Sequence, residues 1–212
     1  AVAPMVTPRE NHAVTVLDGK LYAVGGFNDD DGYLSSVERY DPAVGAWEVV
    51  GPMATKRMDH GVAALDGKLY AVGGQSGDEV LGPVERYDPA TNAWEAVAPM
   101  GTARVHLALA VLDGKLYAVG GYSDGVGYLS SVERYDPAAN AWEEVAPMGT
   151  ARHALGVAVL DGKLYAVGGR NEADDANGGA VRLGYEVVGG GGADGDSAAG
   201  TRRGSARRQA VR

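Results

Sequence analysis

A ten-residue string, Leu-Asp-Gly-Lys-Leu-Tyr-Ala-Val-Gly-Gly, occurs four times without change, and its copies end at Gly26, Gly74, Gly121 and Gly169. The copies are 47 to 48 residues apart. Self-similarity at this period is typical of the blades of a β-propeller, in which each repeat is one small sheet. The chain is therefore expected to be one structural unit copied several times.

Other segments recur in the same order and define the limits of the unit. Val-Glu-Arg-Tyr-Asp-Pro begins at Val37, Val84 and Val132, and Ala-Trp-Glu contains Trp47, Trp94 and Trp142. Pro-Met is followed four residues later by arginine, as Met5 with Arg9, Met53 with Arg57, Met100 with Arg104 and Met148 with Arg152. Three units are complete, and a fourth has its first half and a degenerate third segment at 181–185 but no tryptophan segment. Residues 1–188 thus form about three and a half blades.

The second unit shows how one copy is expected to fold. Four strands are predicted, at residues 61–65, 68–73, 84–87 and 93–97. Asp66-Gly67 favours a tight hairpin turn between the first two, and Pro89 stops the third because proline donates no ladder hydrogen bond. No segment has a helical period. The predicted fold is all-β: a partial β-propeller with three complete four-stranded blades plus an incomplete fourth.

Both faces of the second strand are apolar, because Leu69 and Ala71 alternate with Tyr70 and Val72. A sheet of this kind becomes buried when blades stack on one another. We expect the tyrosine and tryptophan of each unit to fill the space between blades. The double glycine should have positive φ or a close backbone neighbour. Exposed faces on the first and last blades favour self-association through open blade edges.

Composition narrows the function. The absence of cysteine excludes disulfides, thiolate metal sites and a cysteine nucleophile. No apolar run approaches the roughly 20 residues that span a bilayer, and the first residues lack the pattern of a signal peptide. We predict a soluble protein of the cytoplasm or nucleus, with no membrane association and no cofactor.

Charge divides the chain into two parts. The net charge is −9, but residues 189–212 carry five arginines and two aspartates, +3 in all, which leaves −12 for the repeats. An acidic body argues against nucleic acid as the ligand of the repeats. The segment 189–212 is rich in glycine, alanine and arginine and has little apolar surface to bury, so we predict a disordered tail.

These repeated segments resemble those of the kelch-repeat family over about residues 2–188. The phrases at 130–137 and 142–148 are most similar to the BTB-kelch proteins, whose propellers recruit substrates to cullin-3 ubiquitin ligases. The resemblance implies a protein-interaction module, the substrate-binding part of an adaptor, and not an enzyme. Kelch propellers usually close with about six blades, and no BTB or BACK region precedes Ala1. We therefore expect a fragment or an open arc that does not itself carry ligase recruitment.

Binding residues are expected on one face. In a four-stranded blade, the loops from the second to the third strand and the connections from the fourth strand to the next blade emerge on the same side. The loops differ between units, whereas the Asp-Gly and Asp-Pro turns of the other side hardly vary, and tolerated variation is where a partner site can be built. The candidate contacts are Arg9, Arg57, Asp59, His60, Arg104, His106 and Arg152 from the connections, and Phe27, Gln75, Tyr122 and Arg170 from the loops.

The recurring arginines carry the sharpest hypothesis. By resemblance to kelch adaptors they would contact a protein or peptide ligand, including an acidic one, since guanidinium groups bind carboxylates in a bidentate way. We expect the triple variant Arg57→Ala, Arg104→Ala, Arg152→Ala to remain folded and lose its partner. The alternative is that these arginines pair with loop carboxylates or brace the neighbouring blade.

Other polar groups have simpler interpretations. The loops carry carboxylates that match no calcium motif and are predicted to form a solvated acidic rim: Asp29, Asp30, Asp31, Asp78, Glu79, Asp124, Glu172, Asp174 and Asp175. The alternative is that this rim screens the arginines or selects a partially basic partner, which leaves the sign of the peptide open. Four histidines, His12, His60, His106 and His153, lie at different spacings from the arginines, so we predict exposed loop residues and no shared metal site.

Two other classes of function remain open. Kelch folds also occur in enzymes, but the near-identity of the units argues against an active site, which requires some units to differ. The alternatives to an adaptor are a carbohydrate-binding or sugar-modifying kelch protein and an actin-binding kelch protein.

Overall fold

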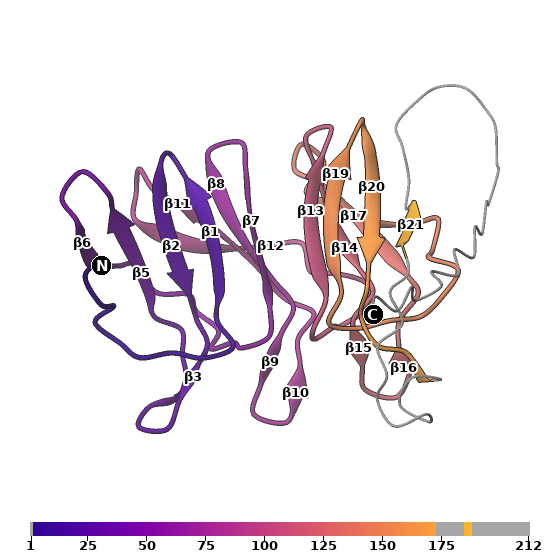
Figure 1. The fold of residues 1–212 in the computed structure, drawn as a ribbon, viewed down its shortest axis with the longest axis horizontal. Coiled ribbons are helices and arrows are strands. Elements are labelled where there is room, and N and C mark those ends of the chain that lie inside the picture. The colour runs from indigo at the N-terminus through magenta and orange to yellow at the C-terminus, as the bar shows by residue number, and fades with distance from the viewer. Residues whose placement is uncertain (1, 173–184, 188–212) are drawn as a thin grey trace, which may run out of the picture.

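The chain forms a series of antiparallel sheets, one for each repeat (Figure 1). The structure is a computed structural model, and it describes residues 2–172 and 185–187. The first sheet contains β1 (Ala13–Leu17), β2 (Lys20–Val24), β5 (Val37–Asp41) and β6 (Ala46–Val50). The second contains β7 (Gly61–Leu65), β8 (Lys68–Val72), β11 (Val84–Asp88) and β12 (Ala93–Val97). The third contains β13 (Ala108–Leu112), β14 (Lys115–Val119), β17 (Val132–Asp136) and β18 (Ala141–Val145).

The fourth sheet is shorter than the others. It consists of β19 (Gly156–Leu160), β20 (Lys163–Val167) and β21 (Tyr185–Val187). The predicted third segment at 181–185 therefore meets the described structure only at Tyr185, where β21 begins. Residues 181–184 and the predicted disordered tail lie outside the described residues.

Three small hairpins lie between the second and third strands of the complete blades. They pair β3 (Phe27–Asn28) with β4 (Gly32–Tyr33), β9 (Gln75–Ser76) with β10 (Glu79–Val80), and β15 (Tyr122–Ser123) with β16 (Gly127–Tyr128). These hairpins were not predicted from the sequence. The four-stranded blades were, and their strands match the predicted ranges within one residue. The fold class is thereby confirmed.

Tight turns explain the first hairpin of each blade. In the first blade Asp18 and Gly19 have φ values of 50° and 72°. Positive φ at both central residues defines the turn type whose twist matches that of paired strands, and aspartate followed by glycine suits it. At the same end of the sheet, Lys20 Nζ lies 2.7 Å from Asp41 Oδ2. The lysine of the repeated decapeptide thus meets the aspartate of the Asp-Pro turn.

Stacking between blades follows the predicted pattern. Tyr70 of the second blade lies against Tyr135 of the third, with ring centroids 5.7 Å apart. Trp142 Nε1 donates a hydrogen bond of 2.9 Å to the carbonyl of Ala98, which follows the last strand of the preceding blade. The tyrosine of the second strand thus packs against the following blade, and the tryptophan of the fourth strand is hydrogen-bonded to the preceding blade. Because each repeat provides both, neighbouring blades hold each other in a fixed register.

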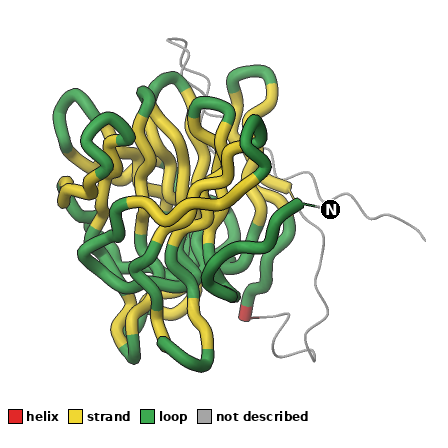
Figure 2. Tube along the Cα trace, turned by 90° about the vertical axis from the view of Figure 1, so that its left-hand side faces the viewer, coloured by secondary structure: helices red, strands yellow, loops and turns green. Residues whose placement is uncertain are grey.

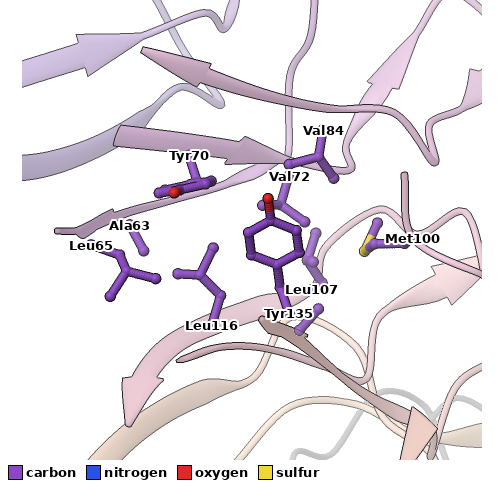
Figure 3. Close-up of a cluster of buried hydrophobic side chains, with 10 residues drawn as sticks. Ala63, Leu65, Tyr70, Val72, Val84, Met100, Leu107, Leu116 and Tyr135 are labelled. Carbon is purple, nitrogen blue, oxygen red and sulfur yellow. The ribbon is translucent and has the colours of Figure 1, made fainter. Parts of the chain in front are cut away.

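The space between the second and third blades is the largest apolar cluster. Figure 3 shows Tyr70 and Val72 from one blade facing Leu116 and Tyr135 from the next. Leu69, Tyr70, Ala71 and Val72 are each at most 1% exposed. The prediction that both faces of this strand are buried is confirmed. At about 25 cal/mol per Å² of apolar surface, stacking supplies the stability that one small sheet lacks.

The double glycine of each decapeptide has the conformation that the sequence predicted. Gly120 has a φ of 59°, and a Cβ built there would lie 2.5 Å from the carbonyl oxygen of Arg152 in the next connection. Gly168 has a similar φ of 70°, yet no described atom lies within 4 Å of its Cβ position. The first glycine of the pair therefore allows the backbone of the connection to the following blade to approach closely.

This difference gives a matched pair of variants. Both Gly120→Ala and Gly168→Ala carry the strain of a positive φ, but only Gly120→Ala collides with backbone. We expect Gly120→Ala to lower the free energy of unfolding by about 2 kcal/mol more than Gly168→Ala does, since backbone overlap costs roughly 1 to 3 kcal/mol. Urea unfolding of both variants measures the difference. Equal losses would show that the close approach contributes nothing.

The two ends of the arc differ from its middle. Large apolar side chains are exposed on the first blade at Val14, Val16 and Leu21, and on the fourth at Val159, Leu160 and Val167. The same strand positions in the second and third blades are more buried because a neighbouring blade covers them. Exposure of the outer faces is thus confirmed, and self-association through them stays a prediction. No helix in the described part of the chain is long and apolar enough to cross a membrane.

Candidate functional site

The loop hairpins and the connections between blades lie on the same side of the molecule, at the bottom of Figure 1. Single bridges join them: Glu10 with Phe27, Met58 with Gln75, Val105 with Tyr122, and His153 with Arg170. The turned view in Figure 2 places strands in the middle and loops at both ends. The predicted common face therefore exists, and we call this side the loop face.

The arginines, however, are not on its surface. Arg57 and Arg104 are fully buried, Arg152 is 8% exposed, and the side chain of Arg9 is fully buried. Arg57 Nη2 lies 2.8 Å from Glu85 Oε1, and its Nη1 donates to the carbonyls of Gly73 and Pro83. The guanidinium groups therefore face inward, away from the surface at which a partner would bind. Their contacts are those of the alternative in which they brace the fold, and the bracing role stays a prediction.

The glutamate of each pair is held by backbone as well. Glu38 accepts from Arg9 at 2.7 Å and from the backbone N–H groups of Val6 and Thr7. Burial raises the pKa of Glu38, but these hydrogen bonds outweigh it and hold the pKa below its usual value. In the first three blades, the recurring Pro-Met-x-x-x-Arg and Val-Glu segments therefore act together and tie the incoming connection to the third strand of the blade.

Four residues, one from each connection, are joined by backbone hydrogen bonds into a row that runs from blade to blade. Asn11, Asp59, His106 and Ala154 share a left-handed conformation, with φ near 50°. The N–H of Asp59 donates to the carbonyl of Asn11, that of His106 to Asp59, and that of Ala154 to His106, at 2.9 to 3.0 Å. Each of these residues lies two positions after its arginine, so the braced arginine sets its place.

The histidines behave differently from the prediction. His60 is 7% exposed and was wrongly assigned both to the binding surface and to the exposed loops, because one position after the row the side chain turns into the space between blades. His106 instead lies beside Asp59, at 3.4 Å between Nδ1 and Oδ1. That carboxylate raises the pKa of His106 against the opposing effect of burial. His106 also contacts His153, with ring centroids 5.7 Å apart. Within the described residues, no cluster of three metal-ligating side chains is present.

A groove opens on the loop face between the second and third blades. Its volume is about 340 Å³, and Val105 and His106 are among its lining residues. One side is formed by the hairpin β9–β10 with Gln75, and the other by the hairpin β15–β16 with Tyr122. A second hollow continues outward from it and shares several lining residues, namely Asp78, Val80 and Asp124.

One sequence change accounts for the groove. In the first and third blades, the last residue of the small hairpin is a tyrosine, paired with the first hairpin residue: Tyr33 with Phe27 and Tyr128 with Tyr122. Tyr33 reaches the next blade, where its hydroxyl donates to the carbonyl of Gly77 at 3.0 Å. In the second blade the same place holds Val80, and the hairpin loop is one residue shorter. Valine is too short to cross, so the space ahead of the second blade stays open.

Sequence reasoning found part of this site. Of the predicted contacts, Gln75, His106 and Tyr122 line the groove, and Asp59 adjoins it through His106. Phe27 lies on the first blade, bridged to Glu10, and Arg170 on the fourth, bridged to His153, and neither lines the groove. Val80 and Tyr128 were missed, although the shorter second loop was the signal that could have identified them.

Comparison with known proteins agrees with the fold and the repeats. A family model described as the KLHDC2/KLHL20/DRC7 Kelch-repeats domain matches residues 2–174. A propeller of kelch type is therefore the class that fold and sequence define. The chain belongs to the kelch-repeat family, and membership of that family indicates a protein-interaction module.

Curated relatives match over about one repeat. The chain is 39% identical to human Kelch-like protein 23 over 51 residues, 24% of this chain and 9% of that protein. It is 42% identical over 48 residues to the F-box/kelch-repeat protein At5g26960 of Arabidopsis thaliana, 23% of this chain and 11% of the relative. For human Kelch repeat and BTB domain-containing protein 13 the identity is 52% over 44 residues, 20% of this chain and 9% of the relative. The match thus spans about a tenth of each relative.

A solved structure titled "Structure of YjhT" resembles the fold. Its TM-score is 0.68 at 17% identity, and the alignment covers 84% of this chain and 67% of the other. At this identity the likeness concerns the propeller fold alone.

Proposed function

We propose that this chain binds a protein partner on its loop face, in the groove between the second and third blades. The observation that carries the proposal is Val80, which leaves open a space that Tyr33 closes one blade earlier. A repeat protein whose units are nearly identical gains a specific site where one unit departs from the rest. The proposal concerns binding and assigns no catalytic role.

The same proposal places the chain in an adaptor, as its substrate-recognition part, in the cytoplasm or nucleus. Support comes from the relatives, since one name combines kelch repeats with a BTB domain and another combines them with an F-box. The acidic ligand that the arginines suggested is not retained, because those side chains are buried in ion pairs. Self-association through the outer blades is a separate prediction, which the sedimentation mass of the chain would test.

Filling the groove tests the proposal. Peptides selected from a random dodecapeptide phage library against the wild-type chain are expected to bind Val80→Tyr at least about tenfold more weakly, since a tyrosine there reaches across as Tyr33 does. Fluorescence anisotropy with the selected peptides measures this change.

Val44→Tyr is the matched control. Val44 is 75% exposed in the turn of the opposite face, so the same substitution leaves the loop face unchanged. Peptides that bind both variants equally well would overturn the proposed site. Glycans on an array or actin filaments in cosedimentation, bound in place of any peptide and lost in Val80→Tyr, would replace it with one of the other two functions.

A further inference from the structure

The groove has an aromatic wall. Tyr122 and Tyr128 meet edge to face with ring centroids 5.9 Å apart, and Tyr128 lies over His153 at 4.7 Å. These rings come from the third blade and its following connection, and all three line the groove. Aromatic faces attract cations and the flat sides of guanidinium groups, because the ring quadrupole is negative above its plane.

Carboxylates stand on both sides of the same groove. Asp78 lies in the turn of β9–β10 and Asp124 in the turn of β15–β16, and both line the groove and the hollow that continues from it. Glu79 joins them in the outer hollow. All three are exposed, and in the described part of the chain no cation of the protein pairs with them.

Among the described residues, the basic side chains that line the groove are those of two histidines, His106 and His153. No lysine or arginine among the described residues contributes to either hollow. Arg104, which lies beneath the surface, is already paired with Glu133, with 2.7 Å between Nη2 and Oε1. His106 faces its own carboxylate, Asp59. An anionic ligand would therefore meet two like charges, while the nearby His106 is already paired with Asp59, whereas a cation would be attracted by the carboxylates of both walls.

We infer that the groove takes a basic side chain, an arginine or lysine of the partner, between the carboxylates of Asp78 and Asp124 and against Tyr122 and Tyr128. This inference rests on the proposed function and specifies its ligand. Two carboxylates on opposite walls suit a guanidinium group, whose donors point in several directions in one plane. The partner segment is thus basic, which agrees with the charge of the acidic loops and not with the acidic ligand that the repeated arginines suggested.

The test uses small probes, so that it does not depend on the peptide selection. N-acetyl-arginine methylamide, titrated into the full chain, is expected to shift the amide NMR signals of Gln75, Val80 and Tyr122. N-acetyl-glutamate methylamide should leave these signals unchanged at the same concentration. Asp78→Asn with Asp124→Asn should weaken binding of the arginine probe by about fivefold or more, since each exposed ion pair contributes modestly.

Asp66→Asn with Asp113→Asn is the control for net charge. These aspartates lie in turns of the opposite face at φ values of 51° and 50°, a conformation that asparagine tolerates. Arginine binding that both double variants weaken equally would overturn the inference, because it would show a general charge effect. Selected peptides that compete for the groove but carry no basic residue would also overturn it while leaving the proposed function standing. If the proposed function itself were wrong, the selected peptides would instead bind Val80→Tyr as tightly as the wild-type chain.

Discussion

Arg57→Ala is expected to lower the free energy of unfolding by about 3 to 5 kcal/mol, because it leaves the buried Glu85 without its counter-ion. Glu85 is 3% exposed, and its other hydrogen bonds come from the backbone N–H groups of Ala54 and Thr55. Small domains are stable by only about 5 to 15 kcal/mol, so this single change removes a large part of the total. Urea denaturation followed by circular dichroism measures it.

Arg86→Ala is the matched control, because it also removes an arginine side chain that is paired with a glutamate. Arg86 directly follows Glu85 in the third strand of the blade. Arg86 is paired with Glu95 at 2.6 Å on the solvent side of the sheet, and Glu95 is 57% exposed at its side chain. An exposed pair contributes at most about 1 kcal/mol. Comparable losses in Arg57→Ala and Arg86→Ala would contradict the bracing role of the buried arginines.

The same reasoning revises the triple arginine variant. Arg57→Ala, Arg104→Ala and Arg152→Ala together would remove the brace of three connections, so loss of β circular dichroism is now expected along with loss of binding. A loss of binding in that variant would therefore reflect unfolding and would not identify the binding site. Val80→Tyr is the informative substitution for the site.

His60→Leu is expected to stabilise the protein and to remove part of its sensitivity to acid. His60 is buried, neither ring nitrogen has a hydrogen-bond partner among the described residues, and burial lowers its pKa to about 3. The third and fourth blades carry Leu107 and Leu155 at the same place, packed against the double glycine as His60 is. Leucine therefore fits the site without an unsatisfied polar group, and we expect a gain of about 1 to 3 kcal/mol at pH 7.

The sign of the pH effect follows from the lowered pKa. The unfolded chain binds a proton at His60 near pH 6.5, whereas the folded chain stays neutral until about pH 3. Stability from this group is complete above pH 6.5 and falls by about 1.4 kcal/mol per pH unit below it, until the folded pKa is reached. Between pH 7 and pH 4.5, the wild type should thus lose about 2 to 3 kcal/mol more than His60→Leu.

Paired carboxylates such as Glu38 and Asp88 also lose stability in acid, since their pKa values are lowered too. Both proteins contain them, so the difference between the two curves isolates His60. Thermal unfolding at several pH values provides the curves. Parallel curves would mean that His60 is hydrated or partnered in solution.

The candidate site shows where pattern alone is insufficient. Arg57 repeats in every unit, and repetition in a propeller is equally consistent with a ring of ligand contacts and with a ring of internal braces. Only the position of Glu85, brought back by the third strand, decides that the guanidinium group points inward. His60 and His106 are one residue apart in register, yet one is buried and the other lines the groove. Such side-chain directions depend on the left-handed residue between the arginine and the next strand.

The sequence by itself determined the number of blades, their strands and turns, and the face on which the variable loops lie. These properties are local or periodic: Asp-Gly turns, prolines and alternating apolar residues act within a few residues of each other, and repetition carries them along the chain. The tertiary structure alone decided which repeated charges are buried and where the face is open. Both depend on contacts between blades. Val80 is an example, because a residue of the second blade decides whether the space next to the third blade is filled.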